Sequence, residues 1–283
     1  LGRHSGDAFV ATFRNIEQNK LALLMRQAID YLQSPLLVEG TELSISASAG
    51  IASYPDDAHD AVSLAKAAEV AMYRMKQEGR NGMRFYAPEM QEFTARSLQL
   101  SASLKQAIAN GELRLVYQPQ MSLTEDRLVG AEALLRWQHP QWGTVSPGVF
   151  IPLAEQSGAI TQIGAWVFEQ VAWQLARWRE AGHDELVIAV NVSAIQFAQP
   201  GFVEETIAVV RRAGVPTQRI EIELTEAVAL HHPEAAAQKI EQLHREGFRI
   251  SLDDFGTGYS SMGYLKRLSL DKLKIDQSFV REV

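Results

Sequence analysis

Two adjacent carboxylates, Asp253 and Asp254, end an apolar stretch that begins at Ile250. Successive side chains of a strand point to opposite faces, so both carboxylates can serve one site only if the strand stops there and the chain bends. Gly256 and Gly258 permit such a bend. Paired oxygen ligands, in a chain without cysteine, favour Mg²⁺ or Mn²⁺ over zinc. The stretch predicts a divalent-metal site of the kind in which two ions about 3.5–4 Å apart promote phosphoester hydrolysis.

Two further stretches place polar side chains on a single face. Alternation along residues 132–136 sets Glu132 and Arg136 on the same side, which combines a cation ligand with a guanidinium suited to phosphate. Glu221 and Glu223 likewise share one face, while the apolar residues between and beside them share the other. These stretches therefore extend the predicted phosphoester site beyond the aspartates.

The amide of Asn191 and the amine of Lys274 are two further polar groups at strand ends. Asn191 ends the apolar run 186–190, where a buried strand would reach the surface, and Lys274 lies on the polar face of residues 272–276. Five strand-like stretches thus each deliver a polar residue to a strand end. We expect these residues to meet at one rim of the fold.

The elements that would position them follow residue 111, where strand-like and helix-like stretches alternate. This alternation favours parallel strands joined by helical crossovers, including a long helix at 163–181. The expected strands are 113–118, 128–136, 186–192, 219–224, 249–253 and 271–275. They predict an α/β fold, a TIM-like barrel whose working face is the carboxyl end of its strands.

The first 87 residues predict a smaller α/β unit. Its expected elements are a hairpin turn running into a strand at 5–10, a helix at 20–32, a half-buried strand at 43–51, a helix through 64–75 and a final strand near 85–86. Residues 88–111 carry apolar side chains at the spacing of one helical face and predict a linker helix. A helix that relays signals between domains is the alternative for this segment.

The first unit resembles the second half of a GGDEF (diguanylate cyclase) domain. The signature stands as Ser5-Gly6-Asp7-Ala8-Phe9, and residues 67–81 match the family's ending. Ala8 occupies the place of the family's acidic Glu, and a methyl group cannot coordinate a cation. The resemblance therefore implies a partial, degenerate GGDEF domain that regulates its neighbour, with GTP as its possible ligand.

The segment after the linker resembles an EAL-family cyclic di-GMP phosphodiesterase. An ordered set of motifs carries this resemblance: Tyr117-Gln118-Pro119, Glu132-Ala133-Leu134-Leu135-Arg136-Trp137, Phe150-Ile151-Pro152-Leu153-Ala154-Glu155, Asn191-Val192-Ser193, Glu223-Leu224-Thr225-Glu226, residues 253–261 and Lys274-Ile275-Asp276. It implies hydrolysis of cyclic di-GMP to linear pGpG with two divalent cations. The expected domains are 1–87 (partial GGDEF), 88–111 (linker) and 112–283 (EAL).

The resemblance also assigns roles to residues. It makes Glu132, Asn191, Glu223 and Asp253 metal ligands, with Asp253 and Asp254 on the side of the second ion. Lys274 would position the attacking water or help to deprotonate it, and Glu226 would brace the loop that follows Asp254. Gln118 and Arg136 would contact the nucleotide.

The rival hypothesis is a receptor that binds cyclic di-GMP and signals without hydrolysing it. Intact metal ligands favour the enzyme. The family's barrel continues beyond the point at which this chain ends, Val283, with a further catalytic glutamate. We therefore expect the sequence to be part of a longer protein.

Composition limits the partners. A formal net charge of −7 argues against nucleic acid polymers, and no apolar run approaches the ~20 residues of a membrane span. The absence of cysteine suits a reducing compartment, so we expect a cytoplasmic protein whose tether, if present, precedes Leu1. The expected assembly is a homodimer through the EAL domain.

Overall fold

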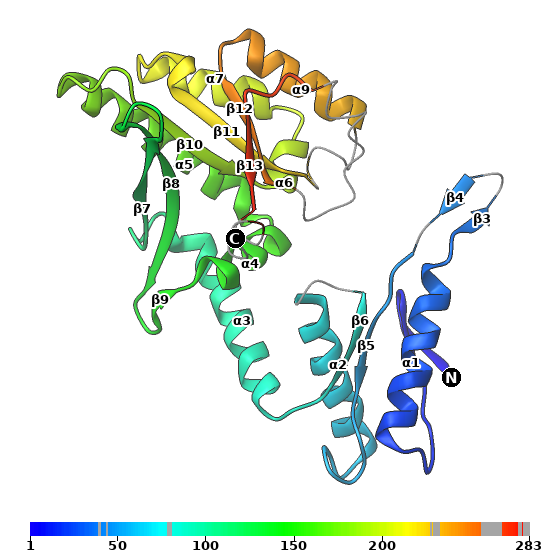
Figure 1. Cartoon of the computed structure of the whole chain (residues 1–283). Coiled ribbons are helices and arrows are strands. Elements are labelled where there is room, and N and C mark those ends of the chain that lie inside the picture. Colours follow the sequence, from blue (N-terminus) through cyan, green and yellow to red (C-terminus); the bar gives the residue numbers. More distant parts are fainter. Residues whose placement is uncertain are drawn as a thin grey trace. The chain divides into compact units, whose positions relative to one another are not determined.

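The computed structural model describes residues 1–38, 41–43, 45–77, 81–226, 228, 233–255, 268–276 and 279. It divides into two compact units, Leu1–Gln99 and Leu100–Val283, each described here by itself (Figure 1).

The first unit is a small α/β arrangement. Its elements are β1 (Gly2–Ser5), β2 (Ala8–Val10), α1 (Gln18–Gln33), β3 (Leu36–Val38), β4 (Thr41–Leu43), β5 (Ser48–Ile51), α2 (Ala61–Gln77) and β6 (Gly82–Phe85). β1 and β2 pair antiparallel, as do β3 and β4, whereas β5 and β6 pair parallel. The expected strand at 43–51 is divided between β4 and β5, because the four residues of β6 pair only with Ser48–Ile51.

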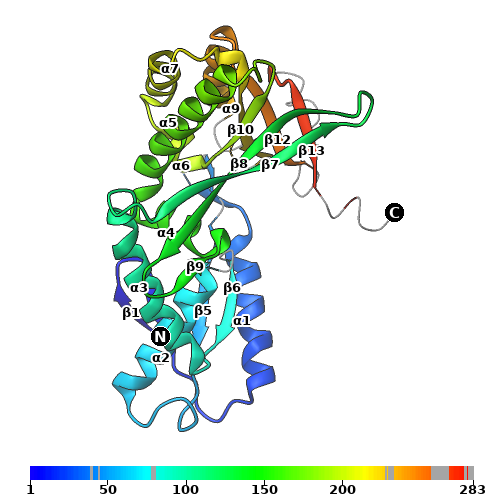
Figure 2. The ribbon, with the colours of Figure 1, turned by 90° about the vertical axis from the view of Figure 1, so that its left-hand side faces the viewer.

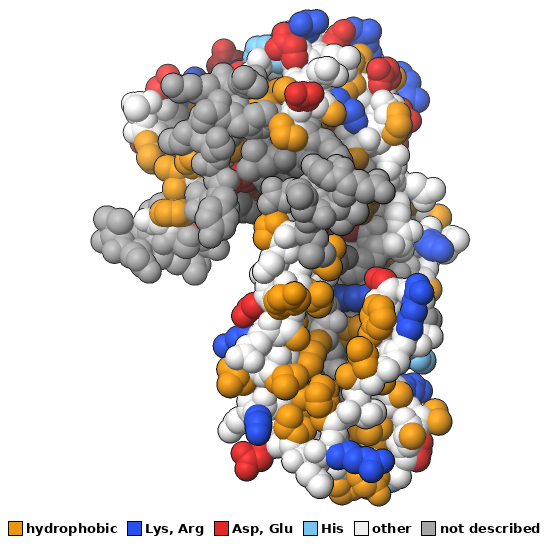
Figure 3. Space-filling view, turned by 90° about the vertical axis from the view of Figure 1, so that its right-hand side faces the viewer, with side chains coloured by type: hydrophobic (Ala, Val, Ile, Leu, Met, Phe, Trp, Pro, Cys, Tyr) orange, Lys and Arg blue, Asp and Glu red, His pale blue; other side chains and the backbone are white. Residues whose placement is uncertain are grey.

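Helix α2 packs directly on β5. A Cβ atom at Gly50 would lie 1.9 Å from the carbonyl oxygen of Ala68, so only glycine allows this approach. The buried apolar side chains of the unit are Ile29, Ile51, Ala58, Ala67, Val70 and Ala71. Other apolar side chains stay exposed, including Leu23, Leu24 and Tyr31 of α1, and Figure 3 shows hydrophobic side chains gathered on this unit.

Helix α3 (Glu89–Ala107) occupies most of the segment expected as a linker helix. In its first half, the ring of Phe93 makes a cation–π contact with the guanidinium of Arg74, which lies 3.8 Å from the ring centroid. In its last turns, Leu100, Leu104 and Ala107 are buried and belong to the core of the second unit. The end of the helix is therefore a structural part of that core.

The second unit is built on a mixed sheet of order β13-β12-β11-β10-β8-β7, with β9 paired to β8. The strands are β7 (Leu113–Ser122), β8 (Arg127–His139), β9 (Gly143–Val145), β10 (Val187–Val192), β11 (Ile220–Thr225), β12 (Arg249–Phe255) and β13 (Lys272–Ile275). Strands β8, β10, β11, β12 and β13 run parallel to their neighbours in that series. This order, with a helix between most strands, is that of a TIM-like barrel.

The expectation of a parallel first pair is wrong. β7 and β8 run antiparallel as a long ribbon (Figure 2). Only residues 123–126 join them, which is far shorter than the dozen or more residues that a parallel crossover requires. Asp126 takes a left-handed conformation, φ 46°, in this turn.

Helices cover the outer face of the sheet in Figures 1 and 2. They are α4 (Pro147–Ser157), α5 (Ala159–Glu180), α6 (Ala194–Ala198), α7 (Phe202–Arg212), the 3-10 turn η1 (Thr217–Arg219) and α9 (Pro233–Arg245). The apolar stripe of α5 is buried at Val167, Val171 and Leu175, while Trp178 packs edge-on against Tyr117 with ring centroids 5.2 Å apart.

Candidate active site

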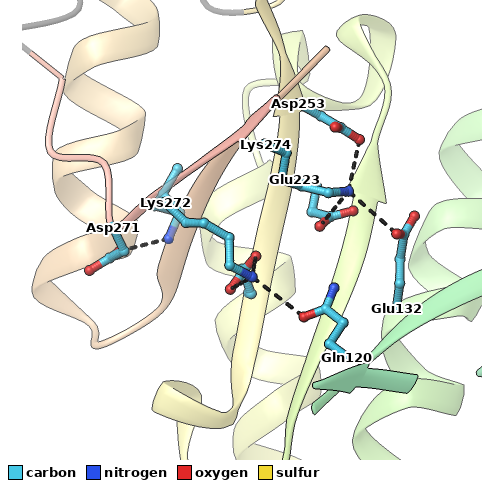
Figure 4. A network of polar contacts seen from close by, with 9 residues as sticks. Gln120, Glu132, Glu223, Asp253, Asp271, Lys272 and Lys274 are labelled. Carbon is cyan, nitrogen blue, oxygen red and sulfur yellow. Dashed lines mark hydrogen bonds and ion pairs between the residues drawn. The ribbon is translucent and has the colours of Figure 1, made fainter. Parts of the chain in front are cut away.

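Three carboxylates singled out in the sequence converge on the ammonium group of a fourth such residue, Lys274. Lys274 Nζ lies 2.9 Å from Glu223 Oε1, 2.9 Å from Asp253 Oδ2 and 3.3 Å from Glu132 Oε2 (Figure 4). These side chains come from β13, β11, β12 and β8. Residues far apart in the sequence therefore share one cationic centre.

Asn191 of β10 joins this cluster through Glu132. Its Nδ2 donates a hydrogen bond of 2.7 Å to Glu132 Oε1, so the carboxylate of Glu132 bridges the amide and the ammonium. Asn191 is exposed to solvent, which places this side of the cluster at an accessible edge.

The strand registers explain the convergence. Asn191 pairs with Glu223 between β10 and β11, and Thr225 pairs with Asp253 between β11 and β12. Residues paired in a sheet point to the same face, so the alternation of each strand sends these polar side chains to one side. The expected meeting of polar residues at one end of the strands is present in the structure.

Glu223 lies deepest in the cluster, and burial raises its pKa to about 7 against the opposing influence of Lys274. The charges of Glu132 and Asp253 raise the pKa further. Its Oε2 has no hydrogen-bond partner among the described residues. A buried carboxylate oxygen in this state can accept a cation without losing an existing bond.

Lys274 keeps its proton. Burial favours the neutral amine, but hydrogen bonds to Glu223 and Asp253 and the charges of Glu223 and Glu132 outweigh it and raise the pKa above its ordinary value. The side chain is therefore an ammonium at neutral pH.

The oxygen donors suit a hard divalent cation in chemical type. In the described part of the chain, however, no three Asp, Glu, His or Cys side chains form a ready metal-binding group. Glu132, Glu223 and Asp253 instead gather around the Lys274 charge. The unpartnered Glu223 oxygen and the all-oxygen donor set fit a metal ion at this position.

The other expected site residues lie at different distances from the centre. Gln118 on β7 stands directly opposite Glu132 on β8, so it shares the face of the cluster. Arg136 lies four residues further along β8, roughly 13 Å at the rise of a strand, and its guanidinium donates to the carbonyl of Leu135 at 2.9 Å. The structure therefore brings Gln118, but not Arg136, to the cluster.

Two further expected residues lie at or near the ends of strands β11 and β12. Glu226 comes directly after β11 and is buried, which fits a supporting role. Asp254 belongs to β12, but its side chain lies outside the described residues, as does Gly256. The expected brace between Glu226 and this loop is therefore a prediction.

Sequence reasoning did not predict the ion pair one layer below. Lys272 Nζ lies 2.8 and 2.9 Å from the two carboxylate oxygens of Glu221, and 3.4 Å from Oε1 of Gln120 (Figure 4). Side-chain alternation in the sequence places these residues on the face of the site, because Glu221 precedes Glu223 by two residues and Lys272 precedes Lys274 by two.

Comparison with known families gives this site its context. Residues 101–283 match the EAL domain model. The chain belongs to the EAL domain family. Residues 1–82 match the model described as "Diguanylate cyclase, GGDEF domain", so a GGDEF segment precedes the EAL domain. Membership of the EAL family implies dependence on a divalent metal in general.

Two curated relatives align with the whole of this chain. The chain is 41% identical over 283 residues to the bifunctional diguanylate cyclase/cyclic di-GMP phosphodiesterase MucR of Pseudomonas aeruginosa, covering 100% of this chain and 41% of MucR. It is 35% identical over 283 residues to the cyclic di-GMP phosphodiesterase PdeR of Escherichia coli, covering 100% of this chain and 42% of PdeR. The chain thus spans less than half the length of these relatives.

Solved structures resemble the EAL domain. The cyclic di-GMP complex of the PaMucR phosphodiesterase is 44% identical with a TM-score of 0.63, and the match covers 65% of this chain and 74% of that one. The FimX EAL domain from Pseudomonas aeruginosa bound to cyclic di-GMP is 28% identical with a TM-score of 0.59, over 65% of this chain and 73% of that one. Within the described residues, every helix is too short or too polar to cross a bilayer.

Proposed function

We propose that the EAL domain of this chain hydrolyses cyclic di-GMP to linear pGpG in a reaction that depends on Mg²⁺ or Mn²⁺. The observation that carries the proposal is the convergence of Glu132, Glu223 and Asp253 on the Lys274 ammonium. The relatives named as cyclic di-GMP phosphodiesterases, and the related domains solved with this nucleotide, support the substrate.

The proposed ligands of two metal ions are Glu132, Asn191, Glu223 and Asp253, with Asp254 completing the second ion's side. Divalent ions at this position would generate hydroxide near neutral pH and neutralise charge that develops on the phosphoryl group. The deep burial of Glu223 favours this role, because a bound cation would compensate the charge that burial makes costly.

Lys274 has a narrower role in this proposal than the sequence suggested. A lysine whose pKa is raised by three carboxylates is a poor proton acceptor at neutral pH. Its ammonium instead holds Glu223 and Asp253 in place and can donate a hydrogen bond to the attacking water. Positioning of the attacking water is therefore the role that we propose for Lys274.

Gln118 and Arg136 are the proposed nucleotide contacts. Gln118 faces the cluster from the opposite strand, whereas Arg136 lies further along β8 on the same face. Their separation suits a substrate larger than one phosphate group, with Arg136 holding a phosphate through its guanidinium.

The GGDEF segment is proposed to regulate the EAL domain and not to synthesise nucleotide, because Ala8 lacks a carboxylate. GTP binding by this segment, a homodimer formed through the EAL domain, a cytoplasmic location and domain boundaries at 1–87, 88–111 and 112–283 belong to the same proposal. Unchanged hydrolysis rates across a GTP titration would contradict the regulatory part.

The test is hydrolysis of cyclic di-GMP by the complete protein that contains this chain, followed by chromatography with and without Mg²⁺ or Mn²⁺. We expect metal-dependent formation of pGpG and a loss of kcat of at least about a hundredfold in Glu132→Gln, since one electrostatic contact to the reacting centre is worth that much. Glu125→Gln is the matched control, because Glu125 is an exposed carboxylate in the β7–β8 turn.

Nucleotide binding without turnover would reject the hydrolase and support the receptor hypothesis. Equal activity of Glu132→Gln and Glu125→Gln would show that the cluster around Lys274 is not the reaction centre. Binding is measured separately by isothermal calorimetry, so the two results distinguish the alternatives.

A further inference from the structure

The ion pair beneath the candidate site connects the two strands that supply Glu223 and Lys274. Glu221 is buried, and both of its oxygens contact Lys272 Nζ, at 2.8 and 2.9 Å (Figure 4). Glu221 and Lys272 point to the same face as Glu223 and Lys274, because each precedes its neighbour by two residues. The two ion pairs are therefore stacked along the same strands.

This repetition creates an ambiguity of register. β11 carries Glu-Ile-Glu and β13 carries Lys-Leu-Lys, so a slide of β13 by two residues would keep every side chain on its own face. Such a slide would present Lys272 to Glu223 and withdraw Lys274. The same slide would break the contact between Glu221 and Lys272.

In the described part of the chain, the outward face of β13 carries little apolar packing. The outward side chains of β13, Leu273 and Ile275, are 49% and 65% exposed. A hydrophobic pattern specifies register strongly only where one face is buried, which is not the case for these two residues. The polar contacts of the inward face are therefore the ones considered for the register of β13.

Backbone pairing with β12 is regular at the beginning of β13 and resumes, after a shift, at Ile275. Asp271 exchanges two hydrogen bonds of 2.8 Å with Ile250, one through its amide and one through its carboxylate. Beyond this point the β12–β13 register shifts between Leu252 and Phe255, next to Asp253. Lys274 thus follows a region where the ladder is irregular.

Both lysines reach across β12 to β11. Ser251 of β12 pairs with Glu223 on one side and with Lys272 on the other, so it stands between the two outer strands. It is fully buried, and its small side chain leaves the path over β12 open to the longer lysines. Side chains on β11 and β13 can therefore define the relative register of strands that are not adjacent.

We propose that the Glu221–Lys272 ion pair fixes the register of β13 and so positions Lys274 within the carboxylate cluster. Glu221 and Lys272 are positioning residues, since they act through Lys274 and not on substrate. Glu221 is buried, whereas 40% of the Lys272 side chain is exposed, so the pair is half-buried. Ion pairs inside a protein contribute little net stability but can specify one register over another. The catalytic meaning of this inference rests on the proposed function, whereas the placement of Lys274 can be measured without it.

The test is competitive acetylation of lysines in the complete protein, without metal or nucleotide, followed by peptide mass spectrometry. Lys239 is the internal reference, because its ammonium donates to the carbonyls of Phe197 and Gln199 at 2.5 and 2.7 Å, away from β13. In Glu221→Gln and Lys272→Met, we expect the Lys274 to Lys239 labelling ratio to rise roughly tenfold, as a local opening of β13 would cause.

Two control variants isolate the positioning effect. Lys272→Arg keeps the positive charge and should retain the low ratio of the unchanged protein. Arg211→Met removes an exposed ion pair with Glu246 on the outer helices and should leave the ratio unchanged. Circular dichroism of each variant establishes that it is folded.

A labelling ratio within about twofold of the unchanged protein in both folded single variants would overturn the proposal. Equal increases at Lys274 and Lys239 would also overturn it, because they indicate a general loss of stability. In the hydrolysis assay, Lys272→Met should lower kcat more than it changes KM. A protein that hydrolyses no cyclic di-GMP would contradict the proposed function only, since the labelling ratio is independent of turnover.

Discussion

At the scale of residues, the candidate site consists of several carboxylates around one ammonium group. Three carboxylates from different strands approach Lys274 Nζ within 3.3 Å, and one of them, Glu223, is buried. Removing one partner from a buried set of charges is costly, because the others remain desolvated without compensation. The single ammonium therefore holds the site together when no metal ion is bound.

Lys274→Met should destabilise the metal-free protein by about 3 kcal/mol, the cost of leaving buried carboxylates unpaired. Addition of Mg²⁺ or Mn²⁺ should recover much of this loss, because a cation can take over the neutralisation of the carboxylates. Urea unfolding with chelator and with metal measures both effects. Lys105→Met, at an exposed helix position, is the matched control, and an equal effect in the two variants would contradict the prediction.

The stability of the metal-free protein should also depend on the ionisation of Glu223. Burial raises the pKa of this carboxyl from 4.5 to about 7, so it binds its proton more tightly in the folded state. Its contribution to stability is complete below pH 4.5 and is lost as the pH rises through about 7. Glu223→Gln cannot lose a proton. We therefore expect the melting temperature of this variant, relative to that of the unchanged protein, to increase as the pH rises from 4.5 to above 7. The same difference in melting temperature between the two proteins at every pH would exclude the effect.

At the scale of elements, close contacts of backbone set the spacing of the strands. A Cβ atom at Gly130 of β8 would lie 2.3 Å from the carbonyl oxygen of Val187 on β10. Neither backbone can move without disturbing the sheet that carries Glu132 and Asn191. Glycine at this position is therefore a requirement of the site as well as of the fold.

Gly130→Ala should lower the free energy of unfolding by about 2 kcal/mol, as overpacking of an interior does, and should weaken metal binding. Gly148→Ala is the control, since a Cβ atom there would meet nothing nearer than Ser146 Oγ at 3.8 Å. Thermal unfolding and a Mn²⁺ titration measure the two consequences. Equal behaviour of the two variants would show that β8 and β10 can separate at little cost.

Side-chain parity along strands was the most informative part of the sequence. It predicted that Glu132, Asn191, Glu223, Asp253 and Lys274 would share a rim, because alternation is a local property of a strand. It could not predict that β7 is antiparallel to β8, which depends on the length of a connection. Parity placed Glu221 and Lys272 on the same face as Glu223 and Lys274, but it could not show that they contact each other, because that contact depends on the stagger between strands that are not neighbours.

At the scale of the whole molecule, the helix expected as a linker is partly a core element. Leu100, Leu104 and Ala107 of α3 are buried with the second unit, and Ser103 Oγ lies 3.2 Å from His139 Nε2. A division of the chain at residue 112 would therefore remove apolar side chains from the core of the EAL domain. A division before α3 would keep them.

Leu104→Ala should destabilise the EAL domain by about 2–5 kcal/mol, since it deletes a fully buried side chain. Leu98→Ala, six residues earlier on the same helix but exposed, should have little effect. Urea unfolding of the complete protein distinguishes the two variants. Similar small losses would indicate that the end of α3 is not required by the core.

The turn between β7 and β8 is a suitable position for a spectroscopic label. Leu123 is fully exposed there, at the far end of the ribbon whose strands carry Gln118 and Glu132. Exposed loop tips accept inserted residues most readily. A fluorescent label attached at Leu123 would report the tilt of the ribbon when a ligand reaches Gln118 and Glu132, without altering any side chain of the reaction centre.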